Sequence, residues 1–330
     1  MVSMATVALP NGAKIPLVGL GTWLSDTPQP SKEAKKVFED GLDAALEAGY
    51  RHIDTAAVYD TEKTIGNVLK KWLDSGRIKR EELFIVTKLP PCGNRPADVE
   101  TWIKKSLTAL QLDYIDLYLI HTPFAFEYVE GDMHPLDADG NIRFDNTTNH
   151  IDVWKEMEKQ VIAGRTRAIG LSNFNIQQIQ RILDNSTVPV SNLQIELHIN
   201  FQQKQLVEFC KSKGITVTAY CPIGNPGLAV RIGKSDVIPC ILKNPAVIEI
   251  AEKYKKTPAQ IALKFIIQHG IIAIPKSTNM KRLKENIDLF DFNINNDDLQ
   301  TLISLDCGEV ARVCDFTFFK GLKNHPEFPF

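Results

Sequence analysis

The stretch FIVTKLPPCGNRPADVETWIKKSLTALQLDYIDLYLI, residues 84–120, contains two short apolar runs separated by an amphipathic segment. The runs at 84–87 and 115–120 are nearly continuous in apolar residues, as expected of strands buried on both faces of a parallel sheet. Residues 97–110 place their apolar side chains at helical spacing. The stretch therefore predicts a strand–helix–strand unit, the repeating element of α/β folds.

The same pattern recurs along the whole chain. Asn11-Gly12, a pair that favours a type I′ turn, predicts a hairpin between 7–9 and 13–15. Eight successive βα units then predict a closed (β/α)8 TIM barrel, an α/β fold, with 1–330 in a single domain. The predicted strands are 17–20, 52–53, 84–87, 115–120, 168–171, 193–195, 215–219 and 271–274, and the predicted helices are 34–45, 62–74, 97–110, 151–163, 175–184, 202–213, 245–268 and 279–290.

Composition narrows the classes of function. The 330 residues carry a formal net charge of -2, so neither a nucleic acid nor an anionic membrane surface is an expected partner. The six cysteines form no CxxC pair and no zinc-ligand spacing, which argues against a disulfide framework or a metal site. We find no signal peptide at the N-terminus, and polar residues interrupt the apolar stretch 261–274. We therefore expect a cytoplasmic monomer.

Polar side chains gather where the predicted strands end. In a barrel of this kind the active site is built at the C-terminal ends of the strands. Three segments too long to be simple turns, 122–149, 221–244 and the tail after Ala311, are expected on the same face. The polar residues at or near the strand ends are Asp54, Tyr59, Lys88, His121, Ser172, Asn173, Gln194, Glu196, Tyr220, Lys276 and Ser277.

Several motifs resemble the aldo-keto reductase family, and the resemblance covers nearly the whole chain. They are VGLGTW (18–23), YRHIDTAAVYDTE (50–62), IVTKL (85–89), YLIHTP (118–123), IGLSNFN (169–175) and IPKSTNMKRLKEN (274–286). The resemblance implies an NADPH-dependent reductase of aldehydes and ketones with Asp54, Tyr59, Lys88 and His121 as the catalytic set. Any one of these residues could be a core residue, but four together at three consecutive strand ends are hard to explain by packing.

The chemistry of this set is consistent with carbonyl reduction. A carbonyl that accepts hydride needs a proton, and a free tyrosine has a pKa of about 10. An ammonium about 4 Å away is worth roughly 4 kcal/mol at an effective dielectric near 20, or about three pKa units. We therefore expect Lys88 to lower the pKa of Tyr59 toward the range useful for a general acid. Asp54 would keep the buried Lys88 charged, and His121 would orient the substrate oxygen.

The hydride must come from a cofactor, because no side chain supplies it. Residues 276–279 precede a predicted helix, whose N-terminus attracts anions, and Lys276 and Arg282 suit the 2′-phosphate of NADPH. The resemblance assigns Lys276, Ser277, Arg282, Glu285 and Asn286 to the adenosine-phosphate end, Ser172, Asn173 and Gln194 to the nicotinamide carboxamide, and Tyr220 to stacking on the nicotinamide ring. The further cofactor candidates are Gly21, Thr22, Trp23, Asp54, Cys221, Ile223, Gly224, Thr278 and Asn279. Many relatives have serine where this chain has Cys221, a weaker hydrogen-bond donor.

The substrate cleft is expected above the nicotinamide. Many aldose-reductase-like members have tryptophan where this chain has Pro90 and Thr122, which predicts a wider cleft that admits a bulky ketone. The loops and tail resemble those of insect members that reduce 3-dehydroecdysteroids. The candidate lining residues are Trp23, Val58, Tyr59, His121, Thr122, Phe124, Phe126, Phe316, Phe318 and Phe319.

Two other interpretations start from the same residues. Tyr59 and Lys63 match the YxxxK pair of short-chain dehydrogenases, but there the pair follows a glycine-rich nucleotide loop that this chain lacks. Barrels that resemble aldo-keto reductases also serve as non-catalytic channel subunits or lens proteins, and such a role would not require the complete catalytic set.

Overall fold

Eight parallel strands form the centre of the protein. The computed structural model describes residues 5–24 and 31–330. The N-terminal segment in which no signal peptide is expected includes residues 1–4, which lie outside the described residues. The strands neighbour one another in the order β12-β11-β10-β9-β6-β5-β4-β3. The two ends of the sheet meet where Val18 pairs with Ala273, and Ala273 exchanges backbone hydrogen bonds with Leu17 and Gly19. The predicted (β/α)8 barrel is thus confirmed. Its strands are β3 Leu20–Gly21, β4 His52–Asp54, β5 Phe84–Leu89, β6 Ile115–Ile120, β9 Thr166–Ser172, β10 Val190–Glu196, β11 Thr216–Tyr220 and β12 Ile272–Ala273.

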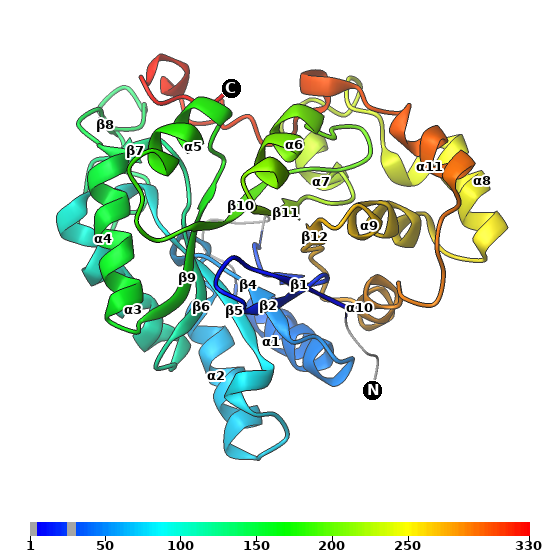
Figure 1. Ribbon diagram of the computed structural model, residues 1–330, viewed down its shortest axis with the longest axis horizontal. Coiled ribbons are helices and arrows are strands. Elements are labelled where there is room, and N and C mark those ends of the chain that lie inside the picture. The colour runs from blue at the N-terminus through cyan, green and yellow to red at the C-terminus, as the bar shows by residue number, and fades with distance from the viewer. Residues whose placement is uncertain (1–4, 25–30) are drawn as a thin grey trace.

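Helices surround the barrel (Figure 1). Every predicted helix is present, with ends shifted by a few residues, except that the segment predicted as one helix over 245–268 is two. Lys255 ends the first of them in the left-handed region at φ 54°, and Thr257 caps the second, which begins with Pro258. The helices are α1 Lys32–Glu47, α2 Glu62–Asp74, α3 Val99–Leu110, α4 His150–Ile162, α5 Ile176–Leu183, α6 Lys204–Ser212, α7 Pro226–Arg231, α8 Pro245–Tyr254, α9 Pro258–Gln268, α10 Met280–Ile287 and α11 Asn296–Ile303, with short 3-10 turns η1 Ala57–Tyr59, η2 Arg80–Glu82, η3 Pro91–Gly93, η4 Pro96–Asp98, η5 Ile241–Lys243, η6 Gly308–Ala311 and η7 Leu322–Asn324.

The predicted hairpin covers the N-terminal end of the barrel. Strands β1 Thr6–Ala8 and β2 Lys14–Pro16 pair antiparallel, and Gly12 takes a φ of 82° in the turn between them. Leu9 and Ile15 are buried against strand residues inside this end of the barrel, among them Phe84. This end is therefore filled by apolar packing, which leaves the opposite end for chemistry.

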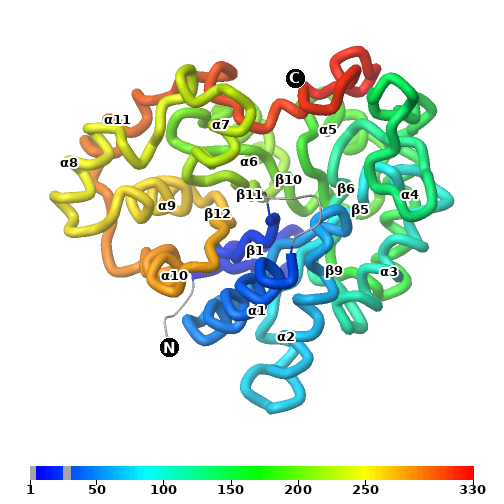
Figure 2. Tube along the Cα trace, turned by 180° about the vertical axis from the view of Figure 1, so that it is seen from behind, coloured from blue at the N-terminus to red at the C-terminus, as the bar shows by residue number. Residues whose placement is uncertain are grey.

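The three long segments lie at that opposite end. Segment 122–149 contains the small hairpin of β7 Ala125–Phe126 and β8 Phe144–Asp145. Segment 221–244 contains α7, and the C-terminal tail crosses above the barrel beside α7 in both views (Figures 1 and 2). Arg181 of α5 ties the end of the tail down through two hydrogen bonds, of 2.7 and 2.9 Å, to the Glu327 carboxylate. None of the helices in the described parts of the chain has the length and apolar character that crossing a bilayer would require.

Candidate active site

Lys88 lies at the centre of the site. It sits on β5 with a completely buried side chain, and its Nζ donates to Asp54 Oδ1 at 2.6 Å and to the Thr55 carbonyl oxygen at 2.8 Å. Its Nζ is also 3.5 Å from the Tyr59 hydroxyl, longer than an ordinary hydrogen bond but in direct contact. Lysine, aspartate and tyrosine therefore form one contiguous group at the C-terminal ends of β4 and β5.

A tight turn brings Tyr59 back over the end of β4. The 3-10 turn η1 carries Tyr59, and Asp60 follows in the left-handed region at φ 54°. Buried hydroxyls hold both ends of this turn: Thr55 Oγ1 and Thr61 Oγ1 are 3.0 Å apart, and Thr22 Oγ1 lies 3.4 Å from Thr61 Oγ1. The tyrosine ring is thus presented by a braced turn and remains partly exposed.

His121 follows β6 and faces Tyr59. The two ring centroids are 5.6 Å apart at an interplanar angle of 76°. Burial and the nearby Lys88 ammonium hold the pKa of His121 well below its ordinary value, so the ring is neutral at physiological pH. Its Nδ1 is buried and has no hydrogen-bond partner among the described residues. A neutral imidazole has one N–H to donate and one nitrogen to accept.

The prediction that Lys88 lowers the pKa of Tyr59 is wrong. Burial raises the pKa of Tyr59 well above its ordinary value, and the Asp54 carboxylate raises it further. The Lys88 charge does not reverse this because Asp54 lies 2.6 Å from it, so the pair is nearly neutral as seen from the phenol. Burial also lowers the pKa of Lys88, against the opposing charge of Asp54. Tyr59 therefore holds its proton firmly in the free protein.

Asp54 has a second partner that the sequence did not reveal. Gln194 on β10 donates from Nε2 to Asp54 Oδ2 at 2.7 Å, and both side chains are buried. Thr22, predicted as a cofactor residue, is fully buried and donates to the Asp54 carbonyl oxygen at 2.9 Å. The two carboxylate oxygens are therefore each held by one donor, and Asp54 is fixed in orientation. The contact of Gln194 with the nicotinamide carboxamide stays a prediction.

The residues expected near the nicotinamide form a second network. Asn173 takes a φ of 65°, donates from Nδ2 to the His121 carbonyl at 2.9 Å and to Ser172 Oγ at 3.1 Å, and accepts from the Tyr220 hydroxyl at 2.8 Å. Strand ends β6, β9 and β11 are thereby cross-linked. Tyr220 is partly exposed, as a stacking surface must be.

The residues expected at the adenosine-phosphate end lie just before α10 and along it, from Lys276 to Asn286. Asn279 caps this helix by accepting from the Arg282 N–H at 3.1 Å, and Ser277 Oγ accepts from the Asn279 N–H at 3.1 Å. Lys276 and Arg282 are exposed, and within the described residues neither has an ion-pair partner. Glu285 lies 3.8 Å from Lys281, Asn286 is buried, and Thr278 packs against α1.

Gly21 has a structural reason of its own. A Cβ at Gly21 would lie 2.8 Å from the Ile274 carbonyl oxygen, so glycine permits the close approach of β3 to the chain after β12. Cys221 follows β11 at a φ of 48°. Ile223 and Gly224, in the loop that follows, line a cavity of about 360 Å³ with residues of α7 and η5. The cavity therefore lies within the segment between β11 and α8 itself.

The candidate substrate residues fall into two groups. Trp23, Val58 and Phe316 are partly exposed, and Phe318 is 54% exposed. Phe124 and Phe126 are fully buried and pack beneath Phe319 of the tail, with centroid distances of 6.5 and 5.1 Å, so they do not line an open cleft in this conformation.

Where relatives have tryptophan, Pro90 and Thr122 are both buried, and Thr122 donates to the Phe124 carbonyl at 2.8 Å. Because Phe319 of the tail packs over Phe124 and Phe126, the tail covers part of the expected cleft.

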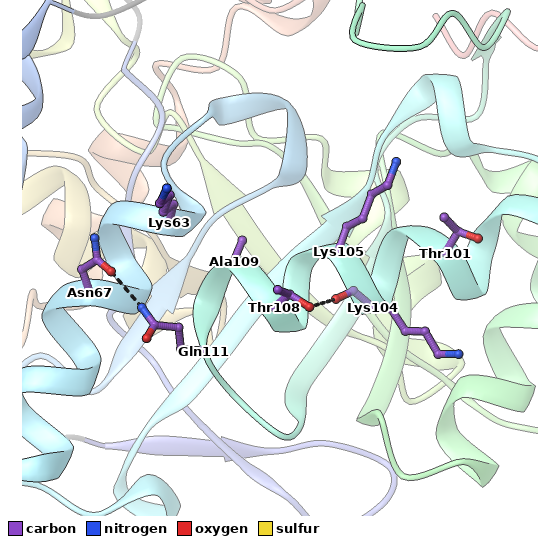
Figure 3. A pocket seen from close by; sticks show the side chains of 8 residues that line it. All are labelled: Lys63, Asn67, Thr101, Lys104, Lys105, Thr108, Ala109 and Gln111. Atoms are coloured by element: carbon purple, nitrogen blue, oxygen red, sulfur yellow. Dashed lines mark hydrogen bonds between the residues drawn. The ribbon is translucent and has the colours of Figure 1, made fainter.

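A larger hollow lies on the outer side of the barrel. It is a groove of about 690 Å³ between α2 and α3, and Figure 3 shows the eight side chains that line it. Gln111 donates to Asn67 across it at 2.8 Å. None of the predicted catalytic or cofactor residues lines this groove, so it is separate from the site. In the described parts of the chain, no group of three or more His, Cys, Asp or Glu side chains could hold a metal ion.

Comparison with known proteins agrees with this geometry. A model of the Aldo/keto reductase family matches residues 17–306. Aldo-keto reductase family 1 member A1 of Gallus gallus is 44% identical over 301 residues, and the Homo sapiens protein of that name is 42% identical over 300; each alignment covers 91% of this chain and 88% of the relative. The solved aldose reductase from Schistosoma japonicum superimposes with a TM-score of 0.87 at 41% identity, covering 99% of both chains. The chain belongs to the aldo-keto reductase family of oxidoreductases.

Proposed function

We propose that this protein reduces aldehydes and ketones to alcohols with NADPH, and that Tyr59 is the proton donor. The observation that carries the proposal is the buried Lys88 ammonium, which contacts Asp54 at 2.6 Å and the Tyr59 hydroxyl at 3.5 Å at the barrel mouth. A merely structural ion pair would have no need of a partly exposed tyrosine held against it by a braced turn.

The residues of the chain divide the work as follows. Tyr59 gives its hydroxyl proton to the substrate oxygen as negative charge develops there. An alkoxide is a stronger base than a tyrosinate, so this transfer is favourable even though the pKa of Tyr59 is raised. The tyrosinate that remains lies beside the Lys88 ammonium, whose stabilisation is felt only as the negative charge appears. The neutral His121 orients the carbonyl oxygen by hydrogen bonding.

NADPH would supply the hydride, and the residues present fit it. Among the described residues, the buried Nδ1 of His121 has no hydrogen-bond partner, and the ring of Tyr220 is partly exposed, as a surface that stacks on nicotinamide must be. At the other end, Lys276 and Arg282 offer two exposed charges beside the N-terminus of α10, which suits a 2′-phosphate. The 221–244 loop, through Cys221, Ile223 and Gly224, would cover the phosphates between the two ends.

The substrate is a small-molecule carbonyl, and its identity is a separate question. The partly exposed aromatic residues favour an apolar or aromatic carbonyl over a charged one. The comparisons do not support the expected likeness to insect 3-dehydroecdysteroid reductases, so a bulky ring ketone enters only as one member of a test panel. We propose that 1–330 acts as one unit, because Glu327 near its end returns to Arg181 on the barrel.

The test is NADPH oxidation followed at 340 nm with a panel of aromatic aldehydes, aliphatic aldehydes and ring ketones. Tyr59→Phe should lower kcat by about 10²- to 10⁴-fold with little change in NADPH affinity. Tyr254→Phe is the matched control, because Tyr254 is a tyrosine of α8 whose hydroxyl donates to Asp298, away from the site. Turnover that survives Tyr59→Phe would refute the proton-donor role. NADPH binding without any turnover across the panel would favour the non-catalytic interpretation.

A further inference from the structure

We propose that Asp315 of the C-terminal tail and Lys234 of the 221–244 loop form an ion pair that acts as a latch. The tail lies on the substrate side of the site, and through this ion pair it holds the loop over the cofactor. The proposal rests on the proposed function, because it takes the loop to cover NADPH. Lys234 Nζ donates to Asp315 Oδ2 at 2.6 Å, and the two side chains are 32% and 21% exposed. These two residues act through the segments they join and are positioning residues.

The tail half of the latch is fixed to the barrel. Glu196 at the end of β10 is completely buried, and its two carboxylate oxygens accept the backbone N–H groups of Val313 at 2.8 Å and Cys314 at 2.6 Å. His198 Nε2 lies 3.1 Å from the same carboxylate. Asp315 comes directly after this double anchor, so its position is set by a strand of the barrel.

The Asp315 carboxylate is itself held in one orientation. Its Oδ1 accepts from the Thr317 N–H at 3.0 Å and from the Thr317 hydroxyl at 2.7 Å, which leaves Oδ2 for Lys234. Phe316 between them takes a φ of 57° and turns its ring against Phe124, with centroids 5.4 Å apart. The residue that binds the loop is therefore next to a residue expected to contact the substrate.

The loop half of the latch is set by the end of α7. The Lys234 N–H donates to the Ala229 carbonyl at 2.8 Å, and its carbonyl accepts from Ile238 at 2.9 Å, so the lysine backbone is tied into the loop on both sides. Its Nζ also approaches the Arg312 carbonyl oxygen at 3.5 Å. The first part of the same loop carries Ile223 and Gly224, which the proposed function places over the cofactor phosphates.

Apolar contacts also connect the two segments that the ion pair links. Leu228, Ala229 and Ile238 of the loop form one buried cluster with Val313 and Cys314 of the tail. Trp23, Tyr220 and Cys221 pack against this cluster from the site. For the loop to leave the cofactor, it must separate from the tail. Because Glu196 anchors the tail, the loop can open only by breaking its own contacts with the tail.

The experiment measures NADPH release by stopped-flow fluorescence in the variants Asp315→Asn, Lys234→Met and the double variant. Asparagine can still accept from Thr317 through its one oxygen, while an NH2 group replaces the oxygen that accepts from Lys234, so the pair with Lys234 is lost and the hold on Thr317 is kept. We expect each single variant to release NADPH about five-fold faster, the upper range for an ion pair that is partly exposed. The double variant should release it no faster than either single one, because all three lack the same pair.

Lys253→Met is the control, since Lys253 pairs with Asp298 at 2.8 Å between α8 and α11, outside the loop and the tail. Release that is unchanged in Asp315→Asn, or effects that multiply in the double variant, would overturn the latch. Limited trypsin digestion without cofactor gives an independent decision: Asp315→Asn should speed cleavage after Arg231 in the loop, and equal rates would overturn the latch. If the unaltered protein binds no NADPH, the proposed function fails, while the digestion still decides whether tail and loop are joined.

Discussion

The buried ion pair of the site offers a quantitative test through Asp54→Asn. The Lys88 side chain is 0% exposed and Asp54 is 3% exposed, and the substitution removes the one carboxylate that contacts the ammonium among the described residues. Removing one partner of a buried pair costs about 3–5 kcal/mol because the other charge stays buried. Lys88 can escape by losing its proton, which at pH 7 costs about 4.6 kcal/mol from an ordinary lysine pKa of about 10.4. We therefore expect a loss of about 3–5 kcal/mol in the free energy of unfolding.

The deficit should depend on pH with a definite sign. In the variant, Lys88 binds a proton in the unfolded chain but gives it up in the folded one. A lysine whose folded pKa is depressed destabilises the fold at low pH, and the penalty disappears as pH rises toward the unfolded pKa. Between pH 7 and 9 the deficit relative to the unaltered protein should shrink by at most about 2–3 kcal/mol, since each pH unit is worth about 1.4 kcal/mol and burial lowers the pKa of Lys88 in the unaltered protein as well.

Equilibrium unfolding in urea at pH 7 and pH 9, followed by tryptophan fluorescence, measures both quantities. Asp74→Asn is the matched control: Asp74 pairs with Lys70 at 2.8 Å, but both side chains are more than half exposed, so we expect a loss under about 1 kcal/mol. If Asp54→Asn costs no more than this control, or if its deficit is the same at both pH values, then Lys88 does not carry a buried charge that Asp54 compensates.

Three further predictions concern turnover and cofactor. Because the pKa of Tyr59 is raised and that of His121 lowered, neither group should produce a midpoint in the rate of reduction between pH 6 and 8, whereas loss of the Lys88 proton, whose pKa burial lowers, would slow the reaction only on the alkaline side; a rate that changes between pH 6 and 7 would contradict the neutral state of His121. Lys276→Ala should lower the affinity for NADPH about 10- to 100-fold and leave the affinity for NADH nearly unchanged, with Lys281→Ala as the control. Equal losses of affinity for both cofactors, measured by fluorescence titration, would show that Lys276 does not bind the 2′-phosphate. Cys221→Ser should increase the affinity for NADPH slightly, because a hydroxyl is a better hydrogen-bond donor than a thiol. A lower affinity in the same fluorescence titration would contradict this reasoning.

The barrel could be predicted because its signal is local. Each strand is a short apolar run and each is followed by a helix, so β5 and β6 are visible in the sequence without any knowledge of their neighbours. The break between α8 and α9 was also visible: Thr257, Pro258 and Gln260 form a capping box with proline at the first turn. Apolar spacing that continues across the break nevertheless predicts a single helix.

That the candidate catalytic residues lie together could be predicted because the strands are parallel, so polar residues at their ends share one face. What could not be predicted are the partners across the barrel. Gln194 is 140 residues from Asp54 in sequence, and nothing local marks their contact. The burial of Phe124 and Phe126 depends in the same way on where the tail lies. Both contacts depend on tertiary packing between segments far apart in the chain, which no local sequence pattern indicates.

The direction of the Tyr59 pKa shift changes how the site should be understood. A lone ammonium would acidify the phenol, but an ammonium paired at 2.6 Å with a carboxylate cannot, and burial then dominates. The pair still has a fixed direction, because Gln194 holds the far oxygen of Asp54 and Thr55 accepts from Lys88. A dipole held in this way does little for the neutral tyrosine and much for a tyrosinate 3.5 Å from its positive end. Under the proposed function, this arrangement stabilises the product of proton transfer, and its contribution lies in kcat rather than in the ionisation of the resting enzyme.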